Sequence, residues 1–533
     1  MRKFLIAAAA VLIILVIAVA VVRHVYAPTL RTMVRDRLQS FLSERFQSTV
    51  EFADLDISVR PHVHVAVKDL ALRHHGRTDV PPLVSFHELS FDVAVRSLFD
   101  ASPKISSVQV SGLKIYVPPR YPGGPPIVKG TDADLAKKYP VIFGEIHTDE
   151  AVLVMLPRDP DKKPHEFDIH HLMLRDVGFG KPAHFRALLS NPVPQGEIDC
   201  IGDFGPWDGE TPASTPVNAT FTFDHADLGT IKGLKGILSS KGKFSGPLDY
   251  LSVEGYTDTP DFALRTSNNP IALHTDYTAI VDGTNGDTVL KNVTAHFLKS
   301  TIVARGAVID ENKFMKGRTI NLDAVSQGAR IEDLLRLAVK SNDPLLTGVA
   351  RLKTKILIPE EDRDMVDRLK LDGQFGIEEM RFTNPSTEGK VDALSRRAQG
   401  HPKDFSLGSD ATELKGRFKL DDAIITFSDL SFGVTGADIQ LTGTYGMDTG
   451  ELDFHGKLIM QAKLSHTTTG VKSFFLKAVD PLFKGKQGGT ELPIKITGTK
   501  EHPQFGLDFH NKENHDSDKA GAKLGHTPPA PGR

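Results

Sequence analysis

The sequence predicts a mainly β protein, in which one N-terminal transmembrane helix precedes a long antiparallel β-sheet with a few short helices. The first observation is alternation: from Leu414 to Asp421, Leu, Gly, Phe and Leu take every second position, with Lys, Arg, Lys and Asp between them. A period of two is typical of a strand with one apolar and one wet face. The other two observations are short polar turns between such stretches and an uninterrupted apolar run near the N-terminus.

The alternation continues through Met460, and Asp448–Thr449–Gly450 forms a turn tripeptide whose glycine can take a positive φ. Strands joined by short polar turns form an antiparallel meander with one apolar face that something must cover. The residues that we expect on this apolar face are Leu414, Phe418, Leu420, Ile439, Leu441, Leu452 and Phe454.

The amino-acid composition indicates which classes of binding partner and which cellular compartments fit this protein. The formal net charge of −3 argues against nucleic acid, whose binders usually carry a strong basic excess. The aromatic residues are 30 Phe against 8 Tyr and 1 Trp, which favours a purely apolar surface. Cys200 is the single cysteine, so it can form neither an intramolecular disulfide nor a Cys-based zinc site. Both a reducing compartment and an exported protein without disulfides fit this count.

The apolar run extends from Phe4 through Leu12 to Val22 and contains no charged or strongly polar side chain. It reaches roughly 28 Å as a helix, close to the ~30 Å hydrocarbon thickness of a bilayer. The alternative is a cleaved signal peptide with Ala18–Val19–Ala20 as the cleavage site. We favour the transmembrane helix because the apolar run passes straight through that tripeptide, and we expect the bulk of the chain outside the cytoplasm.

Residues 28–48 have apolar side chains at helical spacing, beginning with Leu30, Val34 and Leu38. This amphipathic helix either docks on the sheet, which we favour, or lies along the lipid surface. Further short helices are expected around residues 331–338, 391–398 and 471–479. The segment Asn191–Pro216 is rich in Pro, Gly and Asp, and we place a soft boundary there.

The chain therefore divides into six parts. After the anchor, three β regions follow the amphipathic helix, and the last part is polar and lacks large apolar residues, so we expect it to be disordered. The parts are 1–27 (membrane anchor), 28–48 (amphipathic helix), 49–190 (N-terminal β region), 191–345 (central β region), 346–510 (C-terminal β region) and 511–533 (polar tail).

Motifs for catalysis or metal binding are absent from the sequence. His165–Glu166 is followed by His170, one residue too far for the His-Glu-x-x-His zinc arrangement. His62 and His64 would share a strand face but have no third ligand nearby. The stretch Asp282–Asp287 lacks the Glu of an EF-hand and is expected to be a hairpin connection. Acidic pairs such as Glu360–Glu361 have no evident partner. We therefore predict no catalytic, cofactor-binding or metal residue.

Several stretches, in order along the chain, resemble the AsmA family of bacterial envelope proteins. In the N-terminal part they follow the anchor, in the middle they form a helix-then-strand unit, and at the end they form a closing strand pair. They are Val50–Ile57, Val67–Leu72 and Ile105–Ile115; Ile331–Leu335 with Pro344 and Leu346–Gly348; and Leu492–Thr499 with Pro503 and Phe505. The order of these motifs, together with the anchor, is more specific than any one of them.

The resemblance implies an AsmA-like protein held in the inner membrane of a two-membrane bacterium by a single pass, with the bulk of the chain in the periplasm. It also implies a curled, groove-like sheet with an apolar concave face and a role in outer-membrane assembly and phospholipid homeostasis. The family offers no catalytic residues to carry over and no cofactor. The partners implied are phospholipid or another acyl lipid, the inner membrane, and other envelope proteins.

The residues fit a lipid-binding groove, because three short helices are too few to cover so long a run of strands. Acyl chains would complete the cover at about 0.8 kcal/mol per buried CH₂. The seven apolar-face residues from Leu414 to Phe454 are accordingly the candidate groove residues. Two alternatives stay open: a closed sandwich or barrel without lipid, and an envelope scaffold that binds other proteins through sheet edges and loops. Roughly thirty strands in single file would extend on the order of 140 Å.

Overall fold

The computed structural model describes Asp36 and residues 48–508, with gaps at 52, 60–61, 75–80, 83, 95–103, 118–141, 156–163, 178–180, 207–211, 312–316, 341–343, 345, 405–410, 468–488 and 501. The expected anchor (Phe4, Leu12 and Val22), nearly all of the 28–48 helix and the 511–533 tail lie outside the described residues. Among the residues that are described, no helix is long and apolar enough to cross a bilayer.

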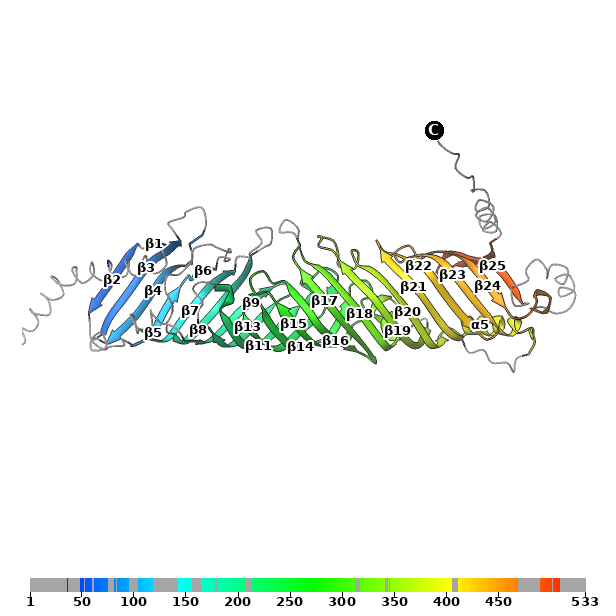
Figure 1. The fold of residues 1–533 in the computed structure, drawn as a ribbon, viewed down its shortest axis with the longest axis horizontal. Helices are drawn as coiled ribbons and strands as arrows, with labels where there is room; N and C mark the ends of the chain where they lie inside the picture. Colours follow the sequence, from blue (N-terminus) through cyan, green and yellow to red (C-terminus); the bar gives the residue numbers. More distant parts are fainter. Residues whose placement is uncertain are drawn as a thin grey trace, which may run out of the picture.

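The protein is mainly β, as predicted: the described strands form one sheet of 26 strands (Figure 1). The strands are β1 (Ser48–Glu51), β2 (Asp54–Val59), β3 (His62–His74), β4 (Val84–Ala94), β5 (Lys104–Ser111), β6 (Lys114–Val117), β7 (Ile142–Met155), β8 (His165–Val177), β9 (Ala183–Pro192), β10 (Gln195–Phe204), β11 (Pro216–Asp227), β12 (Leu234–Lys235), β13 (Ile237–Pro247), β14 (Leu251–Leu264), β15 (Ile271–Val281), β16 (Thr288–Phe297), β17 (Ser300–Ile309), β18 (Thr319–Arg330), β19 (Leu346–Ile358), β20 (Lys370–Phe382), β21 (Ala411–Asp421), β22 (Ile424–Val434), β23 (Ala437–Gly446), β24 (Glu451–Met460), β25 (Thr490–Thr499) and β26 (Pro503–Leu507).

The strands follow one another through the sheet in nearly the order of the chain. β1 and β2 both pair with β3, and from β7 to β11 and again from β13 to β26 each strand pairs antiparallel with its successor. The exception to the antiparallel pattern is β7, which pairs parallel with β5 and β6. At about 4.8 Å per strand the file extends on the order of 100 Å, and Figure 1 shows the N-terminal and C-terminal strands at opposite ends.

Local turn chemistry explains several of the strand boundaries. Gly112 has a φ of +63° and separates β5 from β6. Gly450 has a φ of +71° in the turn between β23 and β24. Asp282–Asp287 joins β15 to β16 as a hairpin connection, as predicted, and the carboxylate of Asp282 accepts hydrogen bonds from the backbone N–H and hydroxyl of Thr284.

Two α-helices are described, and both were expected: α4 (Ile331–Ala338) and α5 (Pro385–Ala398). The first turn of α4 contains Asp333, whose carboxylate accepts hydrogen bonds from the N–H of Lys299 (2.9 Å) and the hydroxyl of Ser300 (2.7 Å). These bonds fix α4 to the turn between β16 and β17. The short 3₁₀ helices are η3 (Pro212–Ser214), η4 (Leu228–Thr230) and η5 (Leu464–Thr467). The helix expected around 471–479 lies outside the described residues.

The hydrogen-bond ladder is continuous across the boundaries that we placed at residues 190 and 345. β9 and β10 form a hairpin through residue 190, within the stretch where we expected a soft boundary. β18 pairs with β19 on either side of residue 345. The three β regions are therefore consecutive parts of one sheet.

One face of the sheet is apolar along its whole length. Directly opposed residues in a ladder share a face, so one can follow a row from strand to strand. The row runs through Ile57, Val65, Phe91, Val108, Ile146, Leu174, Phe185, Gly202, Ala219, Phe244, Val253, Ala279, Leu290, Gly306, Leu322, Ile356, Leu371, Leu420, Ile425, Tyr445, Leu452, Gly498 and Pro503. No member of this apolar row is charged.

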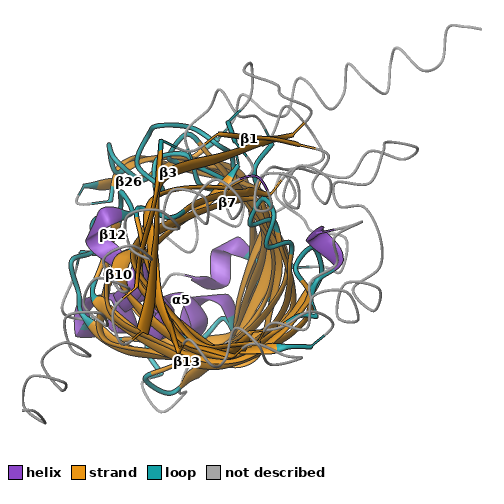
Figure 2. Cartoon of the chain, turned by 90° about the vertical axis from the view of Figure 1, so that its left-hand side faces the viewer, coloured by secondary structure: helices purple, strands orange, loops and turns teal. Residues whose placement is uncertain are grey.

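The sheet curls about its long axis, and the apolar face is the concave one. Figure 2 shows the strands curving around the axis with α5 inside the curl. Val391, Leu394 and Ala398 of α5 contact apolar residues of the sheet, among them Ile377 and Met460. Because the helix inside the curl lies on apolar side chains, the polar face is the one that is turned outward.

Close approach of neighbouring backbones makes Gly456 a test of this register. A Cβ added at Gly456 would lie 1.9 Å from the carbonyl oxygen of Gln440, whereas one added at Gly376 would meet no atom within 4 Å. We expect Gly456→Ala to lower the free energy of unfolding by about 1–3 kcal/mol. The matched Gly376→Ala should change it by less than about 0.5 kcal/mol. Urea unfolding compares them, and equal midpoints would contradict the register.

Candidate functional site

The structure places all seven candidate groove residues on the concave apolar face. Leu420 and Leu452 belong to the apolar row itself. Leu414 lies opposite Phe432, which in turn lies opposite Ile439, and Leu441 lies opposite Leu430. Phe418 and Phe454 are joined through Phe427 and Gly443. Residues that are up to 40 positions apart in the chain (414 to 454) thus line one continuous surface.

Aromatic rings concentrate on this surface. The ring of Phe375 lies 6.0 Å from that of Phe418 and 6.4 Å from that of Phe427, and the rings of Phe427 and Phe454 are 5.8 Å apart. These separations are in the range of favourable aromatic pairs. Phe375 was not among the candidates, although the alternation of Leu371, Phe375 and Ile377 in β20 could have indicated it.

The two described helices cover only one margin of the concave face. Ile331 and Leu334 of α4, together with the apolar residues of α5, join a cluster that includes Ile377, Val434 and Met460. Val434 and Met460 end their strands, and Ala437, which lies in the same cluster, begins one. Leu420 of β21, Ile425 of β22 and Leu452 of β24 lie toward the opposite ends of their strands and do not belong to the cluster that the helices join.

Most of the candidate groove side chains are only partly buried. Leu420 and Phe454 are 6% and 7% exposed, whereas Leu414, Phe418, Ile439, Leu441 and Leu452 are half-buried. In the described part, the side chains that are less than 2% exposed are small ones, such as Ala329, Ser395 and Thr148, and Leu55, Val108 and Met380 are 2% exposed. In a closed sandwich, interdigitated large apolar residues from two sheets fill the centre. The concave face therefore keeps apolar surface that the described residues do not seal.

A loop connects the two margins of the curled sheet. The five pairings from β14–β15 to β18–β19 are all antiparallel, so β14 and β19 run in opposite directions and end on opposite margins. Nevertheless, the loop 359–369 that follows β19 contacts Lys232 and Arg265, which lie at the margin where β14 ends. We call this loop the margin bridge, because it spans the open side of the curl.

Specific hydrogen bonds hold the margin bridge. The N–H of Met365 donates to the carbonyl of Lys232 (3.1 Å), and the Lys232 ammonium donates to the carbonyl and carboxylate of Asp362 (2.9 and 2.8 Å). Arg265 forms an ion pair with Asp364, whose side chain is 6% exposed. Gly233 allows this approach, since a Cβ there would lie 2.4 Å from the Asp364 carboxylate and its φ is +99°.

The polar face carries short-range charge pairs. His64 contacts Asp92 (2.9 Å), and His455 contacts Asp508 (2.7 Å), whose hydrogen bond raises the pKa of His455. The described residues contain no group of three side chains that could hold a metal ion. Burial raises the pKa of the Cys200 thiol to about 12, so the thiol is protonated at neutral pH and is a poor nucleophile.

Comparisons with known proteins give no match. No family model matches the chain, and neither does a curated protein or a solved structure. The resemblance to the AsmA family rests on the motifs quoted above and their order along the chain.

The margin bridge can be tested at its buried carboxylate. Arg265→Ala removes the cation beside Asp364, and a buried carboxylate without its partner costs about 1–2 kcal/mol. We expect hydrogen exchange at residues 359–369 to accelerate by roughly tenfold. The matched control is Arg363→Ala in the same loop, whose partners Glu361 and Asp422 are more exposed, so exchange there should change little. Equal exchange in both variants would rule out Arg265–Asp364 as the fixing contact.

Proposed function

We propose that this protein binds acyl lipid on its concave apolar face and conducts it along the sheet. In this proposal Phe4–Val22 anchors the chain in the inner membrane, most of the chain lies in the periplasm, and lipid movement supports outer-membrane assembly and phospholipid homeostasis. The observation that carries the proposal is the apolar row, which crosses the sheet from β2 to β26 without a charged residue. We assign the protein no catalytic step, no cofactor and no nucleic-acid partner.

Hydrocarbon suits such a surface for a physical reason. Each CH₂ group removed from water contributes about 0.8 kcal/mol, wherever along the row it lies. A charged side chain within the row would interrupt this gain and oppose movement. Because similar half-buried Leu, Ile, Val and Phe side chains recur from strand to strand, a bound chain meets comparable surface at successive positions. Comparable neighbouring sites favour sliding over trapping.

The margin bridge supports a lengthwise route. It joins the two margins of the curl between β12–β14 and β19–β20. Where the margin bridge lies, protein spans the open side of the curl. A lipid on the concave face would therefore move along the long axis of the sheet. Entry and exit are then expected toward the ends of the sheet.

A second candidate function is supported by the last strand. Among the described strands β26 pairs only with β25, and its Phe505 and Leu507 are 75% and 44% exposed. An unpaired strand edge can accept a strand from another protein. This favours a scaffold that binds envelope proteins through its edge, without lipid in transit.

Mass spectrometry of protein extracted from membranes in mild detergent tests the proposal. We expect phospholipid to copurify with the protein, and Phe418→Asp or Leu441→Asp to reduce it at least tenfold, because a carboxylate is disfavoured against hydrocarbon. Thr442→Asp is the matched control, since Thr442 follows Leu441 in β23 but points to the polar face. It should leave bound lipid unchanged.

Wild-type protein that is well folded and free of lipid would refute lipid binding. Photocrosslinking from Ile439 or Phe454 adds a direct readout, because both lie on the concave face. Crosslinks to lipid support the proposal, and crosslinks to protein alone would favour the scaffold.

A further inference from the structure

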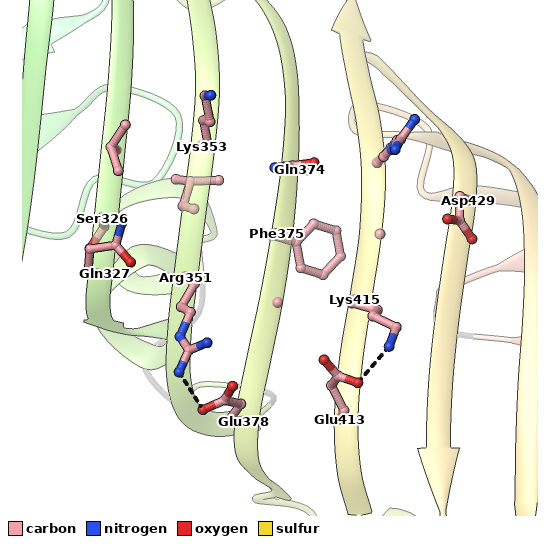
Figure 3. A pocket seen from close by; sticks show the side chains of 15 residues that line it. Ser326, Gln327, Arg351, Lys353, Gln374, Phe375, Glu378, Glu413, Lys415 and Asp429 are labelled. Carbon is pink, nitrogen blue, oxygen red and sulfur yellow. Dashed lines mark hydrogen bonds and ion pairs between the residues drawn. The ribbon is translucent and has the colours of Figure 1, made fainter.

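Two adjoining depressions lie on the polar face over strands β18 to β22, with volumes of about 450 and 560 Å³. They share Lys353, Gln374 and Arg417 in their linings. Figure 3 shows the first of them, with charged side chains from neighbouring strands around it. Both volumes are in the range of small-molecule sites.

The strand register builds these depressions from two cationic walls and a low floor. β19 supplies Arg351, Lys353 and Lys355 as one wall, and β21 supplies Lys415, Arg417 and Lys419 as the other. The floor is β20, whose Gly376, Gln374 and Asp372 lie directly between the paired cations. We call this arrangement the cationic trough.

Gly376 keeps the floor of the trough low. It lies between Arg351 and Lys415, and a Cβ added there would meet no atom within 4 Å. The walls stand about 10 Å apart at the backbone, two strand spacings. Long Lys and Arg side chains on both walls can therefore converge on a group that rests above β20.

Three of the six cations of the trough form no ion pair with a described carboxylate. Three of the six are paired: Arg351 with Glu378 (3.2 Å), Lys415 with Glu413 (2.8 Å) and Lys419 with Asp372 (3.3 Å). The other three, Lys353, Lys355 and Arg417, form no ion pair within the described part of the chain.

Elsewhere on the polar face, cations form ion pairs with an acid of the next strand. Lys243 pairs with Glu254 at 2.6 Å, and Arg186 pairs with Asp199 at 2.7 Å. In the trough, Arg417 lies opposite Asp429 and Lys355 lies opposite Asp323 and Asp372, but neither cation forms an ion pair with these acids. Lys353 lies opposite the neutral Val325 and Gln374, and Gln374 also lies opposite Arg417. Lys353 and Arg417 thus lie on either side of a neutral amide, and an anion bound between them would be attracted by both charges.

We propose that the cationic trough binds a water-soluble ligand through its phosphate groups, centred on Lys353, Gln374 and Arg417. The Arg417 guanidinium can donate two parallel hydrogen bonds to phosphate oxygens, the Lys353 ammonium acts as a point charge, and the Gln374 amide donates from the floor. Two adjoining depressions with a shared centre suit a ligand with two phosphate groups.

The position of the trough favours a soluble ligand over a lipid headgroup. The trough is on the outward polar face, whereas the apolar row is on the concave face of the same strands. A lipid whose acyl chains lie on the concave face therefore cannot place its headgroup in the trough. This inference does not depend on the proposed lipid function.

Isothermal titration of the full-length protein with inorganic pyrophosphate tests the inference. We expect saturable binding, weakened at least tenfold by Arg417→Gln and separately by Lys353→Gln. Lys243→Gln is the control, because Lys243 is an exposed cation of the polar face that already has a partner, and it should bind like the wild type. Thermal unfolding of each variant verifies the fold, and two independent variants keep the test open if one fails to fold.

Three outcomes would overturn the inference: wild-type protein without saturable pyrophosphate binding, equal binding by both trough variants and the wild type, or equal weakening by Lys243→Gln. A second experiment measures binding of the protein to vesicles that contain phosphatidylglycerol. Binding to these vesicles that requires Arg417, without binding of pyrophosphate, would assign the trough to a membrane surface and refute the soluble ligand.

Discussion

Strand register is the constraint on which this structure depends. In a strand the side chains alternate between two faces, so a slip of one residue moves every apolar side chain of that strand to the other face. The apolar row persists from Ile57 to Pro503 only because each strand pairing keeps the apolar residues of both strands on the same face of the sheet. We call this shared alternation the phase of the sheet. Concave apolar surface, outward charges and the separation of the two candidate sites all follow from that shared phase.

Bulges preserve the phase rather than disturb it. Leu290 and Val293 are three residues apart in β16, yet both oppose inward positions of β15, because the register shifts between them. Phe427 and Leu430 in β22 show the same spacing and the same shift. An extra residue in one strand bends it and increases its twist. The same irregularities that let the sheet curl thus keep its apolar side chains on the concave face.

Local features of the fold were readable from the sequence, and distant ones were not. Alternation alone identified the strands around Leu414 to Phe454 and the face that they share, and helical spacing identified α4 and α5. The parallel pairing of β7 with β5 and β6 was not predicted, because alternation within a strand does not show which neighbouring strand it pairs with or in which direction. The margin bridge was also missed. We expected no partner for Glu360–Glu361, but Glu360 accepts a hydrogen bond from the N–H of Glu311 and Glu361 pairs with Arg363. The contact between Lys232 and Asp362 joins residues that are 130 positions apart, so no local pattern contains it. The cationic trough required the register of β19, β20 and β21, which a single strand pattern does not contain.

Because most strands pair with the strand next to them in the sequence, the sheet can fold one hairpin at a time and can change length by whole hairpins. Most strands find their partner within the preceding few tens of residues, so loop closure is inexpensive at each step. The sheet can grow vectorially, each new hairpin adding to a template that is already formed. Duplication or loss of a hairpin would lengthen or shorten the file by about 10 Å without rewiring the rest.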